Sequence, residues 1–485
     1  MTSRLLSGEA DWFDAGRRMA AGEASLVSLW GDEGRMRLCL READGGLAVV
    51  DMAVDRGAFP SIAALHAPAS RLERAACDLY GFLALGAPDG RRWLDHGRWP
   101  LRHPLGRRAP HDGAADPYAF LEARGPGVHQ IPVGPVHAGI IEPGHFRFHA
   151  GGEAVVRLEE RLGYTHKGID ALMRGANLAR GAELAGRVSG DSTVAYAVAF
   201  ARAAEAALGA DAPPRAHWLR GIMAEMERLA NHFGDIGAIC NDAAFALMLA
   251  HCGILRERTL RAAKTAFGHR LMMDVVVPGG AAVDLAPDGI AAIRALVAEA
   301  RSTFPKLVRL YDNTASLQER TVGTGVLAAD LASRFGAGGV VGRASARDVD
   351  ARRDHAYPPY DALTFAVPTR KAGDVDARIW VRILEVGESL DLIETMLARL
   401  PDGPVRRALA PGGGPGEGWA LVEGFRGDVF AHLRLAADGT IARCHLRDPS
   451  WLQWPLLEAA IEGNIVADFP LCNKSFNGSY SGVDL

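Results

Sequence analysis

Ile131-Pro132-Val133-Gly134-Pro135-Val136-His137 and Glu142-Pro143-Gly144-His145-Phe146-Arg147 open the larger part of this chain. The glycines and prolines predict an irregular loop over residues 134–144. Residues 146–158 follow, with strand-like runs on both sides of Gly151-Gly152, which is typical of a β-hairpin. We therefore expect the larger domain to begin with a loop that is carried by a hairpin.

This loop carries a histidine–carboxylate constellation. His137, Glu142 and His145 lie within one short irregular segment, where side chains are free to point into a cleft. Histidine and glutamate together relay protons near neutral pH, so these three residues are the candidate catalytic groups. The alternative is that they only cap the loop by contacting backbone groups.

Beyond the hairpin, the sequence predicts mainly helices. Asp211-Ala212-Pro213-Pro214 marks a helix start, and apolar residues spaced three or four apart follow from Leu219 to Ile236. The other expected elements are two helices, near residues 290–310 and 375–400, and a late hairpin of residues 429–435 and 441–446.

The N-terminal part has a different pattern, with short strands and one helix. Residues 24–30, 36–40 and 47–52 read as strands, and Ser70 to Tyr80 reads as an amphipathic helix. Segments rich in glycine, proline and charge follow. The predicted fold class is α+β: a small α+β domain over residues 1–110, a linker over 111–128, and a mainly helical domain with an N-terminal β-hairpin over 129–485.

Bulk composition excludes several classes of protein. The chain has 485 residues, 48% of them hydrophobic, and a formal net charge of −4, which gives no sign of a nucleic-acid surface. No run of roughly 18 apolar residues occurs, and the first residues do not read as a signal peptide. Six cysteines without any Cys-x-x-Cys pair favour a reducing compartment, and they provide no ligand pair for zinc or an iron–sulfur cluster.

Three further polar groupings have a functional and a structural interpretation each. Gly163-Tyr164-Thr165-His166-Lys167-Gly168 faces a cleft or a partner, or is simply a turn before a helix. Glu225, Arg228 and His232 share one helix face, either as a solvated or internally paired polar stripe or as a buried ion pair that supports the cleft. Arg343 and Asp350 belong to a dense charged loop that binds a cofactor anion or forms surface salt bridges.

Taken together, these blocks resemble one known family. The blocks around Gly134, Gly144 and Gly163, with Arg343-Ala344-Ser345 and Gly373-Asp374-Val375 further on, are similar to the large subunit of formate-hydrogenlyase-type (group 4) [NiFe] hydrogenases. They equally resemble the D-type subunit of NADH:quinone oxidoreductase. Glu73-Arg74-Ala75-Ala76-Cys77-Asp78-Leu79-Tyr80-Gly81 resembles the C-type subunit of that enzyme, so the chain is similar to a C–D fusion.

The resemblance also identifies four altered positions. In these hydrogenases two Cys-x-x-Cys pairs hold nickel and iron, and the matching residues here are Ser189, Ser192, Ser479 and Gly482. A hydroxyl is hard and stays protonated, so it does not replace a thiolate on these metals. The expectation is a chain without a metal site, whose Ser189, Ser192, Ser479 and Tyr480 line a polar pocket for a ligand such as a quinone. The D-type subunit uses a loop histidine for its quinone, which maps onto His145.

Two functions follow from the resemblance as expectations. The first is a subunit of a respiratory oxidoreductase on the cytoplasmic face of the inner membrane, with an iron–sulfur small subunit and antiporter-like membrane subunits as partners. It would bind no cofactor of its own except a quinone, and electrons would come from the partner's iron–sulfur cluster. The second is a non-catalytic scaffold of an ion-translocating complex. An active hydrogenase would require metal held without thiolates.

Overall fold

Three strands of the N-terminal sheet are buried along nearly their whole length, so both faces of this sheet are covered. The computed structural model describes residues 3–110, 117–137, 141–409 and 415–485. Strands β1 (Ser3–Ser7), β2 (Ser25–Asp32), β3 (Arg35–Arg41) and β4 (Leu47–Ala53) form a sheet in the order β1-β4-β3-β2, with β1 parallel to β4. Helices α1 (Glu9–Ala20) and α2 (Ser70–Tyr80) pack on one face.

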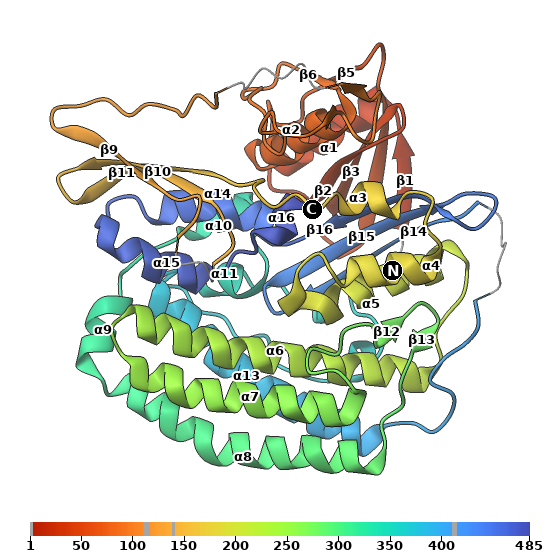
Figure 1. Cartoon of the computed structure of the whole chain (residues 1–485), viewed down its shortest axis with the longest axis vertical. Coiled ribbons are helices and arrows are strands. Elements are labelled where there is room, and N and C mark those ends of the chain that lie inside the picture. The colour runs from red at the N-terminus through yellow and green to blue at the C-terminus, as the bar shows by residue number, and fades with distance from the viewer. Residues whose placement is uncertain (1–2, 111–116, 138–140, 410–414) are drawn as a thin grey trace.

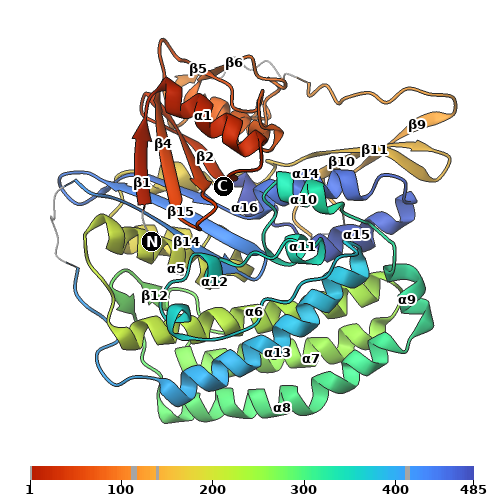
Figure 2. The ribbon, with the colours of Figure 1, turned by 180° about the vertical axis from the view of Figure 1, so that it is seen from behind.

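The other face of this sheet packs on a second sheet. Strands β14 (Glu417–Gly424), β15 (Gly427–Leu435) and β16 (Ile441–Arg447) are antiparallel in that order. Trp30 on β2 stacks on His445 of β16 with ring centroids 5.0 Å apart, and it also contacts Phe430 at 5.5 Å. Ser28 Oγ lies 2.8 Å from His445 Nε2. Residues far apart in sequence thus form one continuous interior (Figures 1 and 2).

A three-stranded sheet carries the loop that opens the larger domain. Its strands are β9 (Val128–Val133), β10 (His145–Gly151) and β11 (Ala154–Arg161), in the order β11-β10-β9. The sheet extends to one side of the molecule in Figure 1. Phe146 and Phe148 of β10 pack against Phe469 at the start of α15 (Phe469–Phe476), which fixes the loop end of the sheet near the C-terminal segment.

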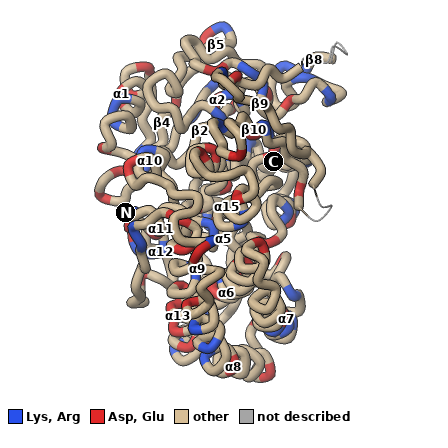
Figure 3. The backbone as a smooth tube through the Cα atoms, turned by 90° about the vertical axis from the view of Figure 1, so that its left-hand side faces the viewer, with Lys and Arg blue, Asp and Glu red and all other residues tan. Residues whose placement is uncertain are grey.

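Four long helices form the opposite end of the molecule. They are α6 (Pro214–Asp242), α7 (Ala246–Phe267), α8 (Pro287–Asp312) and α13 (Val375–Arg399). Helix α6 packs on α7 and α13, and α7 packs on α8. Charged residues lie on the outer sides of α7, α8 and α13 (Figure 3), as expected for helices with one solvent-facing side.

Shorter elements connect these layers. Helix α5 (Thr193–Ala207) lies against β14 and β15, and α14 (Ser450–Ala460) lies against β11. The remaining elements are β5 (Ala58–Pro60), β6 (Leu83–Leu85), β7 (Leu101–Arg102), β8 (Ala109–Pro110), α3 (Ile169–Met173), α4 (Leu178–Ala185), β12 (Val276–Val277), β13 (Gly280–Ala281), α9 (Ala315–Thr321), α10 (Ala329–Arg334), α11 (Gly339–Ala344), α12 (Ala351–Asp354), α16 (Ser481–Asp484), and four short 3-10 turns at Ala67–Ala69, Gly190–Ser192, Tyr360–Ala362 and Val466–Asp468. Among the described residues, no helix combines the length and the apolar character needed to cross a membrane.

The predicted α+β class is confirmed, with a β-rich N-terminal part followed by a more helical one. The helix expected at Ser70 to Tyr80 and the hairpin expected at 146–158 are both present. The late hairpin is part of a three-stranded sheet, because β14 precedes it. The boundaries 1–110, 111–128 and 129–485 stay predictions, and residues 111–116 of the predicted linker lie outside the described residues.

Candidate functional site

A cavity of about 530 Å³ lies where the C-terminal segment meets the loop before β10. Its apolar side is formed by Val133, Ile141, Phe146 and Phe469, and its polar side includes residues from 189–191 and 473–481. Pockets for small ligands usually measure about 300–1,000 Å³ and combine apolar walls with a few polar groups. The size and lining of this cavity fit a small ligand.

The four positions that the resemblance equates with metal ligands come together beside this cavity. Ser189 Oγ lies 3.0 Å from Ser479 Oγ, although the two residues are 290 positions apart. The backbone N–H of Gly482 donates to Ser479 Oγ at 2.9 Å, and Ser192 Oγ accepts from Arg426 Nη1 at 2.9 Å. Three of the four positions carry hydroxyls and Gly482 carries no side chain. Ser189 and Ser479 line the cavity as predicted, whereas Ser192 is not among the described residues that line it.

An arginine–aspartate pair joins these segments. Arg426, in the turn between β14 and β15, donates to both carboxylate oxygens of Asp191, at 2.8 and 2.6 Å. Its Nε donates to the carbonyl of Asn477 at 2.5 Å. Burial raises the pKa of Asp191, but the Arg426 cation and hydrogen bonds from Arg426, Ser189 and Ser192 outweigh burial and hold the pKa below its usual range. Asp191 is therefore ionised at neutral pH and is neutralised by Arg426.

The carboxylate of Asp448 occupies the space beside Gly482, the fourth of these positions. A Cβ atom added to Gly482 would lie 2.7 Å from both Cγ and Oδ2 of Asp448. Asp448 is held in place by the hydroxyl of Tyr196, which donates to Oδ2 at 2.7 Å, and by the N–H of Ser450, which donates to Oδ1 at 2.8 Å. Any side chain at residue 482 would thus have to displace a fixed carboxylate.

These residues do not fit a cysteine-held nickel–iron centre. The three hydroxyls are not soft anionic ligands, and residue 482 has no side chain and no room for one. Within the described ranges, no group of three or more His, Cys, Asp or Glu side chains is arranged to hold a metal ion. The negative charge of Asp191 is matched by Arg426 rather than left for a cation.

The three candidate catalytic residues occupy different positions. His137 and Glu142 line the cavity, whereas His145 is absent from the described residues that line it. Glu142 Oε2 accepts the N–H of Ser481 at 2.9 Å, and His137 Nε2 lies 2.9 Å from the carbonyl of Gly144. His145 is buried on the opposite face of β10, with Nδ1 3.3 Å from the carbonyl of Gly134.

His145 is further defined by its neighbours. Its ring packs near Phe120 at 5.1 Å, and Arg147 Nε donates to its Nε2 at 3.3 Å. Burial lowers the pKa of His145. The hydrogen bond to the Gly134 carbonyl raises this pKa, but burial and the nearby Arg147 cation together outweigh it, so the pKa lies below its usual value. His145 is therefore a neutral, internally bonded side chain, and the predicted role in turnover stays a prediction.

Tyr480 is the aromatic residue of the polar wall. Its ring lies between Trp454, at 4.8 Å, and Phe146, at 6.5 Å, and its hydroxyl is 3.4 Å from Asn473 Nδ2. A Cβ atom at Gly144 would come within 2.6 Å of this ring, so glycine is needed there. Burial raises the pKa of Tyr480, so its hydroxyl stays protonated and keeps a proton to donate.

The Gly163–Gly168 block fixes the C-terminal segment instead of lining the cavity. The carboxylate of Asp484 accepts the N–H groups of Gly163 and Thr165 at 2.6 and 2.9 Å. His166 Nδ1 lies 2.6 Å from the carbonyl of Asp484, and Lys167 Nζ donates to the carbonyl of Val188 at 2.7 Å. This block thus positions both segments that carry the serines.

Arg343 and Asp350 lie in a buried ion cluster away from the cavity. Arg343 Nη1 and Nη2 contact Asp350 at 3.3 Å, Glu423 at 2.9 Å and Glu385 at 2.7 Å, and its side chain is 0% exposed. Three arginines face four carboxylates in this cluster: Arg228, Arg343, Arg352, Glu225, Asp350, Glu385 and Glu423. The predicted cofactor role of Arg343 and Asp350 stays a prediction, and their observed contacts are internal ion pairs.

Two of the three carboxylates that contact Arg343, Glu385 and Glu423, differ in proton affinity. Burial raises the pKa of Glu385, but Arg343 and His232 outweigh it and hold that pKa well below its usual range. Burial, reinforced by the charge of Asp350, raises the pKa of Glu423 above its usual value. The stripe of Glu225, Arg228 and His232 on α6 is buried and internally ion-paired, and the predicted support of a cleft stays a prediction.

A further acidic group lies just behind the cavity wall. Glu227 of α6 accepts the N–H groups of Val194 and Ala195, at 2.7 and 3.1 Å, at the start of α5. Burial raises its pKa to about 8 despite these hydrogen bonds, and the Asp191 charge adds to the increase. Sequence reasoning missed Glu227, Arg426 and Asp448, because their roles depend on contacts between distant segments.

Comparisons with known proteins agree with this architecture. The family model described as "Respiratory-chain NADH dehydrogenase, 49 Kd subunit" matches residues 242–413, and that of the 30 Kd subunit matches residues 39–114. Hydrogenase-4 component G of Escherichia coli (strain K12) is 30% identical over 457 residues, which cover 90% of this chain and 77% of the relative. Formate hydrogenlyase subunit 5 of the same organism is 30% identical and covers 90% and 78%.

Two further comparisons concern the fused arrangement and the fold. The fused C/D subunit of NADH-quinone oxidoreductase from Phocaeicola vulgatus is 28% identical, over 78% of this chain and 78% of the relative. The fold is similar to that of a chain in the membrane-bound sulfane sulfur reductase, an archaeal respiratory membrane complex. The TM-score is 0.70 at 24% identity, and the match covers 74% of this chain and 99% of that chain. This likeness shows the fold. The chain belongs to the family of hydrogenase-4 and formate-hydrogenlyase large subunits and NADH-quinone oxidoreductase C/D subunits, with a 30 Kd-type part followed by a 49 Kd-type part.

Proposed function

We propose that this chain is the hydrogenase-like subunit of a membrane-associated oxidoreductase related to the NADH-quinone oxidoreductases, and that it has lost the nickel–iron centre. In this proposal the cavity beside Ser189 and Ser479 takes a quinone headgroup. Electrons arrive from an iron–sulfur cluster in a small partner subunit, and antiporter-like membrane subunits couple the redox step to ion movement. The subunit sits peripherally on the cytoplasmic face of the inner membrane.

One observation carries the loss of the metal centre. The Arg426 guanidinium binds Asp191 through two hydrogen bonds between the two serine segments, and Asp448 fills the space beside Gly482. A guanidinium and a carboxylate that satisfy each other leave no charge for a metal to balance. The cavity next to them remains open and has both apolar and hydrogen-bonding walls.

Quinone reduction suits the chemistry of this wall. A quinone that accepts two electrons and two protons becomes a quinol, and its carbonyl oxygens need hydrogen-bond donors while charge builds up. Tyr480 supplies a protonated hydroxyl, and the adjacent Asn473 supplies an amide N–H. Val133, Ile141 and Phe146 supply the apolar surface against which a ring packs.

The test is metal analysis and quinone-dependent turnover of the purified complex. We expect iron from the partner subunit without nickel, and Tyr480→Phe is expected to lower quinone-dependent turnover by about two- to tenfold, the effect of one hydrogen bond of about 0.5–1.5 kcal/mol. Tyr164→Phe, a partly exposed tyrosine outside the described lining of the cavity, is the control. Stoichiometric nickel would overturn the proposal, as would equal turnover in both variants.

A non-catalytic scaffold is the second candidate function. The observation in its favour is that Arg426, Asp191, Ser189, Ser192 and Ser479 satisfy one another, so that the former metal position needs no ligand. A scaffold predicts a complex that assembles normally, shows no quinone-dependent turnover, and is unaffected by Tyr480→Phe. The state of the partner's clusters during turnover separates the two, because only the redox function oxidises and reduces them.

A further inference from the structure

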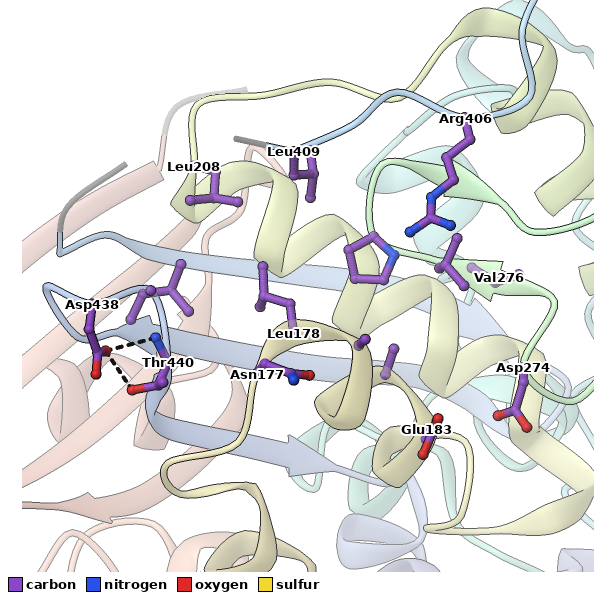
Figure 4. Close-up of a pocket in the computed structure, with 16 residues that line it drawn as sticks. Asn177, Leu178, Glu183, Leu208, Asp274, Val276, Arg406, Leu409, Asp438 and Thr440 are labelled. Carbon is purple, nitrogen blue, oxygen red and sulfur yellow. Dashed lines mark hydrogen bonds between the residues drawn. The ribbon is translucent and has the colours of Figure 1, made fainter. Parts of the chain in front are cut away.

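A second cavity, of about 480 Å³, lies apart from the serine site. It is enclosed by α4, by β12, by the turn between β15 and β16, and by residues 406–409 (Figure 4). Among the described residues, no residue that lines it also lines the cavity beside Ser479. Its occupant would therefore differ from the ligand proposed above.

The walls of this cavity are mostly apolar. Figure 4 shows Leu178, Leu208, Val276 and Leu409 around the open space. The apolar lining residues include Leu178, Leu208, Val276, Val277, Leu409 and Leu435. Surface of this kind gains free energy when an apolar body replaces water, at roughly 25 cal/mol for each Å² covered.

The acidic residues at the rim already have partners. Asp274 pairs with Arg187 through two contacts of 2.7 Å, and Glu183 pairs with Arg180 at 2.7 Å. Asp438 accepts the N–H and the hydroxyl of Thr440, at 2.9 and 2.7 Å. Asp274 and Glu183 are thus neutralised by arginines, whereas Asp438 bonds only neutral groups and keeps its negative charge.

Arg406 is a charged residue of the cavity lining whose side chain has no partner among the described residues. Its side chain forms no hydrogen bond or ion pair with any residue in the described parts of the chain, and in Figure 4 its guanidinium points toward the cavity. A guanidinium presents a planar fork of donors that matches a carboxylate in two parallel hydrogen bonds. Arg406 is the one cationic side chain among the described residues that line the cavity, so it is the group there that can bind an anion.

The backbone fixes the position of Arg406. The N–H of Ala281 donates to the carbonyl of Val405, and the N–H of Arg407 donates to the carbonyl of Gly279, both at 2.8 Å. A Cβ atom at Gly280 would lie 2.1 Å from the carbonyl of Val405, so only glycine allows this approach. Arg406 is therefore held between two backbone anchors rather than on a free loop.

We propose that this cavity binds an amphiphilic monocarboxylate of the size of a medium-chain fatty acid. Its carboxylate pairs with Arg406, and its alkyl chain lies along Leu178, Leu208 and Val276. A monoanion is favoured over a phosphate dianion because one arginine is available and three carboxylates surround the rim. Asn177 uses its side-chain oxygen to cap α4, so its amide N–H₂ remains available to the ligand.

The test is calorimetric titration of the full-length chain with decanoate. We expect saturable binding at one site, a loss of at least about tenfold in affinity in Arg406→Ala, and little change in Arg407→Ala. Both arginines are exposed, but Arg407 lies outside the described lining of the cavity. Decan-1-ol, which has the same chain without the charge, should bind more weakly and should not distinguish the two variants.

A filling variant locates the site. Ala179 lies on the cavity wall and is exposed, and Ala179→Leu should reduce decanoate binding while the circular-dichroism spectrum and melting temperature stay near those of the parent. The proposal is overturned if decanoate shows no saturable binding, if both arginine variants behave alike, or if decan-1-ol binds as tightly as decanoate. These measurements involve no turnover, so their outcome is independent of the proposed redox function.

Discussion

Glu385→Gln tests whether the buried ion cluster is a structural element or part of a ligand site. Glu385 lies 2.7 Å from Arg343 and 3.6 Å from Arg228, and its side chain is 1% exposed. At an effective dielectric constant of about 20, unit charges 4 Å apart interact by about 4 kcal/mol, so two arginines attract this carboxylate by about 8 kcal/mol. Repulsion from the other carboxylates offsets part of this attraction.

The net loss is expected to be about 3–5 kcal/mol, the range observed when one partner of a buried ion pair is removed. Glutamine keeps the shape of glutamate, so the loss reports charge and hydrogen bonding rather than a cavity. Glu385 offers Oε1 to Arg343 and Oε2, at 2.7 Å, to His232, whereas glutamine has a single acceptor oxygen, so one of these two contacts loses its acceptor. The variant should therefore unfold at a clearly lower urea concentration than the parent.

The assay is urea unfolding of the full-length chain, followed by tryptophan fluorescence at pH 7. Glu394→Gln is the matched control, since Glu394 lies on the same helix and forms an exposed pair with Arg301. A surface pair contributes about 0–1 kcal/mol, so this control should change little. If Glu385→Gln costs no more than Glu394→Gln, the view of the cluster as a structural element is wrong.

Two further predictions concern the serine site and its surroundings. Gly482→Cys should destabilise the chain by about 1–3 kcal/mol, because the new Cβ atom would lie 2.7 Å from Asp448. The same variant should not raise the nickel content of the purified complex. Normal stability together with nickel uptake would contradict this prediction. Glu227 has a pKa raised to about 8, whereas an unfolded glutamate titrates near 4.3, so the native state keeps a proton that the unfolded state has released. Stability should therefore fall as pH rises from about 4.3 to about 8, and Glu227→Gln should flatten that part of the unfolding free-energy profile; identical pH profiles of parent and variant would refute this assignment.

Local patterns were sufficient for the elements that carry the site. The helix from Ser70 to Tyr80 and the hairpin around Gly151 follow from apolar periodicity and turn chemistry alone. Strand alternation also explains the position of His145. Once Phe146 and Phe148 pack against Phe469, the residues between and before them must face the other side of β10, away from the cavity.

Contacts between distant segments were the part that the sequence did not reveal. Arg426 lies in a strand turn, and nothing in its neighbourhood indicates that it binds Asp191, 235 positions earlier. Arg343 and Asp350 look like a surface loop, yet Glu385 and Glu423 compensate the buried charge of Arg343 from two other elements, and Arg352 pairs with Asp350. Charge balance of this kind is a property of the folded chain, and a linear pattern does not contain it.

Because Trp30 stacks on His445, the two sheets stabilise each other in the folded chain. A substitution in one sheet therefore limits which substitutions the other sheet can accept. A smaller residue at position 30 would leave a void between β2 and β16, which the opposing strand would have to fill. Substitutions at Trp30, Phe430 and His445 should therefore be accepted as matched sets. Exchange of the N-terminal part with that of a relative should succeed only when this small patch of side chains is transplanted with it.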